Sequence, residues 1–422
     1  MTLLTQLKNK ELTWNFSTFL VMASGGLLLN LVLAILYGPT GVGVFNQVFA
    51  FFLVFGQIST LGCQWAVLHL AAKNREDEGF VASTLIASIG VTLACSLLIA
   101  VLIFFSAPLV GALFDSEPIE KGYQAIAPFI VFFGVNKLLI NASNSLGRYR
   151  LFSIARASRF ILLAIVTMAF YFSGGPIWAL PLIFCFTEVL LCLLLSSIYA
   201  GLLLKGIRTG GIVNRTKQIV PFGLKSLTGG AVAEFNTRTD IIILGIFLDD
   251  DLVGIYSIAA LFAEGLIELG NIVRFIVNPQ APKLFAEEGV AGLEPFYRKW
   301  RNTTMLIVTS VAIVSSLIYP FVIELVIRDP EFIKGWASYS ILAAGIAMAS
   351  GYKALDMSFN QLGFPAEQTR YRLKIFFANV VANFLLIPFI GLTGAAIGTV
   401  ISFLCGVYWF KRTIHRLIGL KI

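Results

Sequence analysis

The sequence predicts an all-α polytopic membrane protein, MOP/MATE-like in outline, with about twelve transmembrane helices in two pseudo-symmetric six-helix lobes. Its composition, its apolar runs and an internal repeat lead to this fold class. Of the 422 residues, 58% are hydrophobic and 13% are charged, and the mean hydropathy is +0.86. A soluble chain of this length needs far more charge to cover its surface, so lipid is the expected solvent.

The apolar runs are long enough to cross a bilayer. A crossing helix needs about 20 mostly apolar residues to span roughly 30 Å of hydrocarbon. Twelve runs qualify: 16–37, 44–71, 81–106, 122–146, 152–173, 176–199, 221–247, 252–276, 303–327, 336–360, 371–390 and 392–410. Because backbone groups in hydrocarbon must bond within their own segment, these runs predict helices. The connections are too short to hold a catalytic core, so we expect no enzyme.

The distribution of lysine and arginine predicts the orientation. With the N-terminus in the cytoplasm, 21 of them fall in segments on the cytoplasmic side and 3, Lys121, Arg328 and Lys334, on the outer side. Cytoplasmic loops carry this excess in membrane proteins, so both termini are predicted to be cytoplasmic. The net charge of +8 is therefore a signal of topology, and no nucleic-acid partner is expected.

Two pairs of segments repeat at about half the chain length. NKLLINASNSLG (136–147) aligns without gaps to YKALDMSFNQLG (352–363), and GVGVFNQVFAFF (41–52) parallels LVGIYSIAALFA (252–263). Six predicted helices separate the copies, so both halves have the same orientation. The repeat predicts lobes over 1–210 and 211–422, related by an axis along the membrane normal, with the site between them.

Polar side chains recur on one helical face in each half. The candidates for substrate binding are Lys137, Asn141 and Asn144 in the fourth run, and Lys353, Asp356 and Asn360 in the tenth. A cationic face that carries amides suits an anionic or sugar-bearing ligand. In the alternative interpretation, Lys353 pairs with Asp356 while Lys137 extends towards the inner interface.

Further charges lie inside the predicted spans, where they are costly without a partner. Candidates for ion coupling are Glu188, Glu234, Asp240, Glu264 and Glu268, and Arg238 is a further candidate substrate contact. Arg156 and Arg159, near the cytoplasmic end of the fifth run, are candidates for a gate or mouth of the path. Structural alternatives stay open: Glu234 pairs with Arg238, Glu188 pairs with Arg159, or the arginines of the fifth run are interface anchors.

No cofactor or metal site is expected. The sequence lacks the G-x-x-x-x-G-K-[ST] loop that cradles phosphates, and its two histidines and five cysteines have no ligand spacing. Coupling to H+ or Na+ is left open.

At the seventh and eighth runs the chain resembles a known family. EFNTRTDIIILGIFLDDDLVGIYSIAALFAEGL (234–266) is similar to the polysaccharide transporter branch of the MOP superfamily, which includes the O-antigen flippases. The similarity includes an Arg-x-Asp (Arg238, Asp240) followed by V-G-x-Y (Val253, Gly254, Tyr256). NPQAPKLFAE (278–287) and GLTGAAIGTVIS (391–402) lie where that branch has similar segments.

The resemblance implies a flippase of the cell inner membrane. Such proteins move an undecaprenyl-diphosphate-linked oligosaccharide to the outer leaflet through a cationic cavity with alternating access. Expected partners are the lipid-linked glycan and, as an open point, a glycan polymerase and glycosyltransferases of the same pathway. An ion-coupled small-molecule or multidrug exporter of the same superfamily is the alternative. The absence of a carboxylate from 16–37 disfavours it, because those exporters commonly have one there.

Overall fold

The computed structural model describes the backbone of residues 10–422, and the side chains of 25–422 except 209, 228–231 and 233. All regular elements within 10–422 are helical, as predicted. In chain order they are α2 (Lys10–Ser59), α3 (Cys63–Lys73), α4 (Glu78–Phe114), α5 (Glu117–Ile126), η1 (Ala127–Phe129), α6 (Ile130–Ser145), α7 (Tyr149–Phe172), η2 (Ile177–Ala179), α8 (Leu182–Thr209), α9 (Ile212–Phe247), α10 (Asp250–Val322), η3 (Ile323–Ile327), η4 (Pro330–Gly335), α11 (Trp336–Lys353), α12 (Ser358–Gln361) and α13 (Pro365–Ile418).

Several of these helices can cross a membrane. Among the described residues, eight helical segments are long and apolar enough to do so. Three of the longest helices, α2, α10 and α13, are broken at Gly38, Gly289 and Gly391. Each glycine has φ between 57° and 65°, a conformation that residues with a Cβ rarely adopt. The total of twelve spans and the cytoplasmic termini stay predictions.

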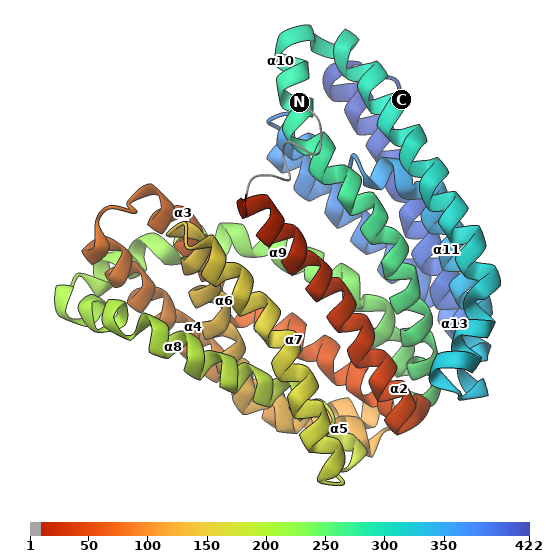
Figure 1. The fold of residues 1–422 in the computed structure, drawn as a ribbon, viewed down its shortest axis with the longest axis horizontal. Helices are drawn as coiled ribbons and strands as arrows, with labels where there is room; N and C mark the ends of the chain where they lie inside the picture. The colour runs from red at the N-terminus through yellow and green to blue at the C-terminus, as the bar shows by residue number, and fades with distance from the viewer. Residues whose placement is uncertain (1–9) are drawn as a thin grey trace. The chain divides into compact units, whose positions relative to one another are not determined.

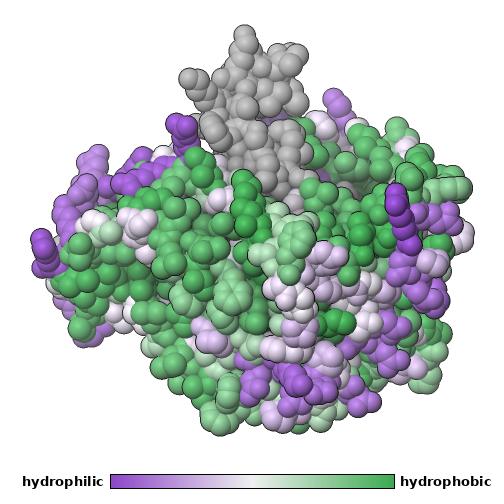
Figure 2. Space-filling view, turned by 60° about the horizontal axis from the view of Figure 1, so that its bottom comes forward, coloured by the Kyte–Doolittle hydropathy of each residue, from purple (hydrophilic) through white to green (hydrophobic). Residues whose placement is uncertain are grey.

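The surface is largely hydrophobic where helices are not packed on one another. Figure 2 shows broad green areas of hydrophobic residues on the face in view. Phe105, Phe172 and Phe389 are 77%, 82% and 84% exposed. Exposed apolar area of this extent is typical of a surface that faces lipid.

The chain forms two compact units. The first contains the residues up to Leu36 and Val44–Glu234, and the second contains Tyr37–Gly43 and Phe235–Ile422. The boundary thus lies at Glu234/Phe235, while the predicted lobe boundary lies at 210/211. In the first unit α4 packs against α5, α6 and α8, and α7 packs against α8. In the second, α11 packs between α10 and α13 (Figure 1).

The segment Tyr37–Gly43 joins the second unit through a reciprocal glycine contact. A Cβ on Gly43 would overlap the carbonyl oxygen of Asp250, and a Cβ on Gly254 would overlap that of Pro39. Gly43 and Gly254 are equivalent positions of the predicted repeat, and Pro39 and Asp250 each lie four residues before the glycine of their own segment. Glycine is thus required at both positions because the two backbones touch directly.

The other pair of repeated segments, 136–147 and 352–363, shares a turn but differs in its helix. Gly147 and Gly363, aligned in the repeat, both have positive φ, at 67° and 90°. The helix before Gly147, α6, is continuous through Lys137. The corresponding helix of the second unit ends at Lys353 and resumes as the short α12. The two halves therefore hold their predicted polar faces on different backbones.

Candidate transport site

The second unit contains a polar cavity of about 340 Å³ between α9, α10, α11 and α13. Its lining includes five of the predicted site residues: Arg238, Asp240, Glu264, Glu268 and Lys353. Side-chain amides and hydroxyls complete the polar part, from Asn236, Thr237, Tyr256, Asn271, Asn379 and Thr399. Ligand sites of this size usually combine an apolar lining with a few convergent polar groups. Charged side chains are rare within membrane helices, and five of them line this cavity.

Lys353 is held by an aromatic ring. Its Nζ lies 3.6 Å from the centroid of the Phe403 ring, a cation–π contact that partly compensates for the loss of water. Within the described part of the chain, no carboxylate oxygen lies within 4.0 Å of that ammonium group. The ammonium group therefore lines the cavity without a direct ion pair to a described carboxylate.

Asp240 is tied to the wall of the cavity. Its Oδ2 accepts a hydrogen bond of 3.0 Å from the hydroxyl of Tyr256, and its Oδ1 accepts one from the backbone N–H of Ile241. The Arg-x-Asp and V-G-x-Y motifs thus meet in space. Gly254 makes the close backbone contact described above, and Tyr256, two residues later, bonds Asp240.

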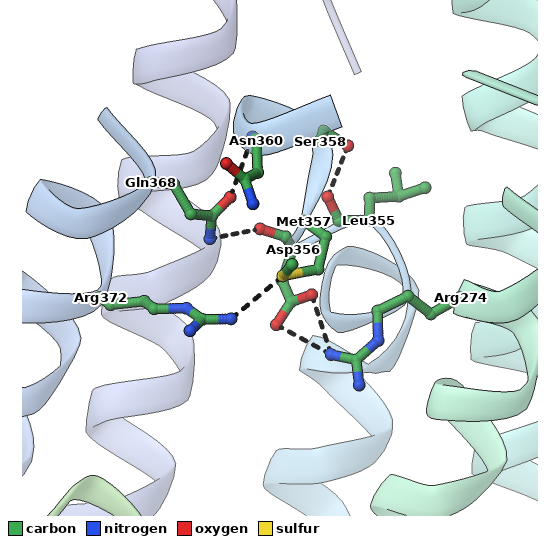
Figure 3. A network of polar contacts seen from close by, with 8 residues as sticks. All are labelled: Arg274, Leu355, Asp356, Met357, Ser358, Asn360, Gln368 and Arg372. Carbon is green, nitrogen blue, oxygen red and sulfur yellow. Dashed lines mark hydrogen bonds and ion pairs between the residues drawn. The ribbon is translucent and has the colours of Figure 1, made fainter. Parts of the chain in front are cut away.

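Asp356 and Asn360 are not in the lining of this cavity. Asp356 forms an ion pair with Arg274 of α10, with 3.2 Å between Oδ1 and Nη1 (Figure 3). The backbone N–H of Asn360 donates to Oε1 of Gln368. Among the described residues Asp356 thus pairs with Arg274, and no ion pair within 4.0 Å joins it to Lys353.

In the first unit, Lys137 also contacts an uncharged acceptor and a ring. Its Nζ donates to Oε1 of Gln57 at 2.6 Å and lies 4.5 Å from the centroid of Phe133. Asn141, one turn later, uses its amide on the carbonyl oxygen of Lys137. Asn144 lies half-buried on the same helix. Each repeat thus holds one lysine against one phenylalanine.

Glu188 is fully buried and paired. Its Oε1 lies 2.7 Å from Nε of Arg159, which confirms the predicted partner. Asn136 donates to both Oε2 and the carbonyl oxygen of Glu188, at 2.7 Å and 2.8 Å. Arg156 lies with its guanidinium 5.1 Å from the ring centroid of Phe152. Glu188 thus has the contacts of a structural ion pair: Oε1 lies against Arg159, and Oε2 accepts hydrogen bonds from Asn136 and Arg159.

The sequence analysis identified most of the charged residues of the site but missed the side chains that contact them. Arg274, Phe403, Gln368 and Asn379 were not singled out, although each contacts or lines the region around Lys353. Arg274 alone carried a signal, since it is an arginine inside the predicted span 252–276. Among the described residues, no group of three His, Cys, Asp or Glu side chains could hold a metal ion.

The sequence profile of a family described as "Polysaccharide biosynthesis protein" matches residues 10–265, more than half of the chain. The chain belongs to this family. The match confirms the resemblance to the polysaccharide transporter branch, since the matched residues include the Arg-x-Asp and V-G-x-Y motifs. No curated protein matches the chain by sequence.

Solved structures share its fold over nearly the whole length. One is an inward-facing multidrug resistance MATE family transporter of the MOP superfamily, with a TM-score of 0.77 and 14% identity. The alignment covers 94% of this chain and 95% of the transporter. The lipid II flippase MurJ, in an inward closed conformation, has a TM-score of 0.76 at 15% identity, covering 96% and 87%. The MATE multidrug transporter DinF-BH has a TM-score of 0.57 at 16% identity, covering 96% and 94%. The MATE-like fold is thus confirmed.

Proposed function

We propose that this protein is a flippase that moves an undecaprenyl-diphosphate-linked oligosaccharide, such as an O-antigen repeat unit, from the cytoplasmic to the outer leaflet of the cell inner membrane. The observation that carries the proposal is the polar cavity of the second unit, lined by Lys353 and Arg238 within a body of lipid-facing helices. Membership of the polysaccharide biosynthesis family supports the class of cargo.

The lining of the cavity suits the two parts of such a headgroup. A diphosphate is anionic, and the ammonium of Lys353 is a compact charge that binds phosphate oxygens well. Sugar hydroxyls need both donors and acceptors, which Asn236, Asn271, Asn379 and Thr399 supply. The lipid tail needs no such groups because it stays in the bilayer while the cavity opens alternately to each side.

The cavity carboxylates supply a means of coupling to H+ or Na+. Glu264 lines the cavity and is exposed to it. Glu268, one turn along α10, has a buried Oε2 that accepts no hydrogen bond among the described residues. Asp240 is bonded through both oxygens. We therefore propose Glu264 and Glu268 as the groups that take up the coupling ion, and we assign Glu188 to structure.

An ion-coupled exporter of small molecules is the second candidate. Two observations favour it: the pair of carboxylates in the cavity, and the similar fold of a MATE multidrug transporter. A cavity that binds organic cations needs carboxylates more than lysines. This cavity holds two cationic side chains beside its three carboxylates, so both cargo classes find partners in it, and the family match favours the glycan lipid.

Deleting the gene separates these functions. A flippase predicts that lipid-linked glycan accumulates at the cytoplasmic leaflet and that surface glycan is lost. Intact surface glycan with increased sensitivity to drugs would instead support the exporter. Genes for glycosyltransferases and a glycan polymerase beside this one would identify the proposed partners.

Substitutions then test the site itself. In the deletion strain, Lys137→Ala and Lys353→Ala are each expected to abolish glycan export at normal protein abundance. Lys283→Ala is the matched control, since it removes a lysine that lies outside the cavity. The side chain of Lys283 is 75% exposed and makes only a long ion pair, 3.9 Å, with Glu287. Normal export in both test variants would contradict the role of these lysines.

A further inference from the structure

The helix that carries Lys353 breaks immediately after this residue. α11 ends at Lys353, a turn follows over 354–357, and α12 begins at Ser358. The turn sequence, ALDM, contains neither glycine nor proline, the residues that usually break a transmembrane helix. Contacts from other parts of the second unit hold the break.

Gln368 of α13 supplies the main contact. Its Nε2 donates to the carbonyl oxygen of Asp356 at 2.9 Å, and its Oε1 accepts from the N–H of Asn360 at 3.4 Å (Figure 3). The side chain is only 5% exposed. Gln368 thus satisfies one acceptor and one donor that the interrupted helix leaves without their usual partners. On the other side, the hydroxyl of Tyr297 donates to Ser358 at 2.8 Å.

Arg274 determines where the carboxylate of Asp356 points. Its Nη1 lies 3.2 Å from Oδ1 and 3.5 Å from Oδ2, and both side chains are mostly buried, at 29% and 26% exposure. Residues three apart on a helix are neighbours, so Asp356 is the nearest carboxylate in sequence that could neutralise Lys353. With Asp356 bound to Arg274, the ammonium of Lys353 lies instead over the ring of Phe403.

We propose that Arg274 is a positioning residue for transport: by binding Asp356, it prevents that carboxylate from neutralising Lys353 and keeps the lysine available to the anionic group of the cargo. Gln368 holds the backbone of the break in which this arrangement is possible. The inference rests on the proposed function for its consequence in transport. Its structural part, the position of Lys353, does not depend on the cargo.

Among its described residues, the first unit has no counterpart of the Arg274–Asp356 pair, and the aligned repeat shows why. In the aligned repeat, the position of Asp356 is occupied by Ile140. Lys137 therefore has no carboxylate three residues later, and α6 continues unbroken past it. Its neighbours are the neutral Gln57 and the ring of Phe133. Arg274 thus compensates for a carboxylate that the first repeat lacks.

The structural part is tested by solving the structure of Arg274→Ala. The expected result is that Lys353 Nζ leaves the Phe403 ring and approaches the carboxylate of Asp356 to within 4.0 Å. An unchanged Lys353 would overturn the inference. Arg372→Ala is the matched control, because Arg372 lies at the same break but donates to the sulfur of Met357. In that variant Lys353 should not move.

The functional part uses suppression in the deletion strain. Arg274→Ala is expected to lower glycan export about tenfold or more at normal abundance, a change typical of losing one charge-assisted contact. Adding Asp356→Asn removes the competing carboxylate while Gln368 still holds the backbone. Export by the double variant should return to within about threefold of the wild type, and Asp356→Asn alone should lie in the same range.

Three results would overturn the proposal: full export by Arg274→Ala, a double variant as inactive as Arg274→Ala, or loss of export in Asp356→Asn alone. The second would mean that Arg274 itself contacts the cargo, and the third that Asp356 has a role of its own. Absence of glycan export in the wild type would instead contradict the proposed function. The structure of Arg274→Ala would still decide the position of Lys353.

Discussion

Replacing Glu188 with alanine is expected to destabilise the first unit by about 3 kcal/mol. The substitution removes a carboxylate with 0% exposure and leaves Arg159, 19% exposed, without the partner that lies 2.7 Å away. Insertion scales give about 2.5–3.5 kcal/mol for an unpaired arginine at the centre of a membrane helix, which is an upper value for Arg159 because it lies nearer the predicted cytoplasmic end. Breaking a buried ion pair in soluble proteins costs about 3–5 kcal/mol. The amide of Asn136 also loses the carboxylate as an acceptor and keeps the backbone carbonyl oxygen of position 188.

The assay is equilibrium unfolding of the purified protein in bicelles, with export measured in parallel. The double substitution Arg159→Met and Glu188→Met removes both charges and keeps apolar volume, so we expect it to be more stable than either single variant. It should also retain export in proportion to the folded protein. A decrease in the free energy of unfolding of less than about 1 kcal/mol in Glu188→Ala would refute the magnitude derived from burial. A stable Glu188→Gln variant without export would refute the structural role and restore ion coupling.

Two further predictions concern packing and pH. Gly254→Ala should destabilise the protein by about 1–3 kcal/mol, because the new methyl overlaps the carbonyl oxygen of Pro39. Gly265→Ala, on the same helix with no atom within 4 Å of its Cβ, should stabilise it by up to about 1 kcal/mol. The pKa of Glu78 is lowered from 4.5 by the hydrogen bond and charge of Lys205. An NMR titration should give a midpoint below 4.5 that rises in Lys205→Gln.

Each of these predictions has a contradicting result. Equal stability of the two alanine variants would show that the close backbone contact at Gly254 does not constrain the fold. Because the pKa of Glu78 is depressed in the folded state, its pair with Lys205 stabilises the fold above the pKa of the unfolded state. This stabilisation is lost as the pH falls through the pKa of the folded state. A midpoint unchanged by Lys205→Gln would mean that the 2.6 Å contact does not persist in solution.

The sequence predicted the helical fold well because lipid imposes a simple rule. Runs of about 20 apolar residues must form helices, and rare charges within them stand out. The pair of Glu188 and Arg159 was predicted from this rule alone, because a buried carboxylate needs a cation. The motif residues Asp240 and Tyr256 were noted without the hydrogen bond that joins them.

Other features depend on contacts between distant segments. The break after Lys353 has no local signal, since a glutamine of α13 holds it. The helical spacing that placed Lys353, Asp356 and Asn360 on one face assumed an unbroken helix, and it gave no sign that Asp356 pairs with Arg274. The ring of Phe403 comes from a residue fifty positions later in the chain. A single sequence carries no information on such pairs when the side chain involved is an ordinary apolar residue.

The central claim is that this protein moves a glycan lipid between leaflets, and reconstitution tests it most directly. Purified protein is placed in liposomes with a fluorescently labelled undecaprenyl-diphosphate oligosaccharide, and a membrane-impermeant glycosidase is added outside. Flippase activity predicts that nearly all the labelled glycan becomes accessible with time, whereas Lys353→Ala vesicles behave as protein-free vesicles do. An accessible fraction that stays at the protein-free level with the wild-type protein, with and without H+ or Na+ gradients, would contradict the claim.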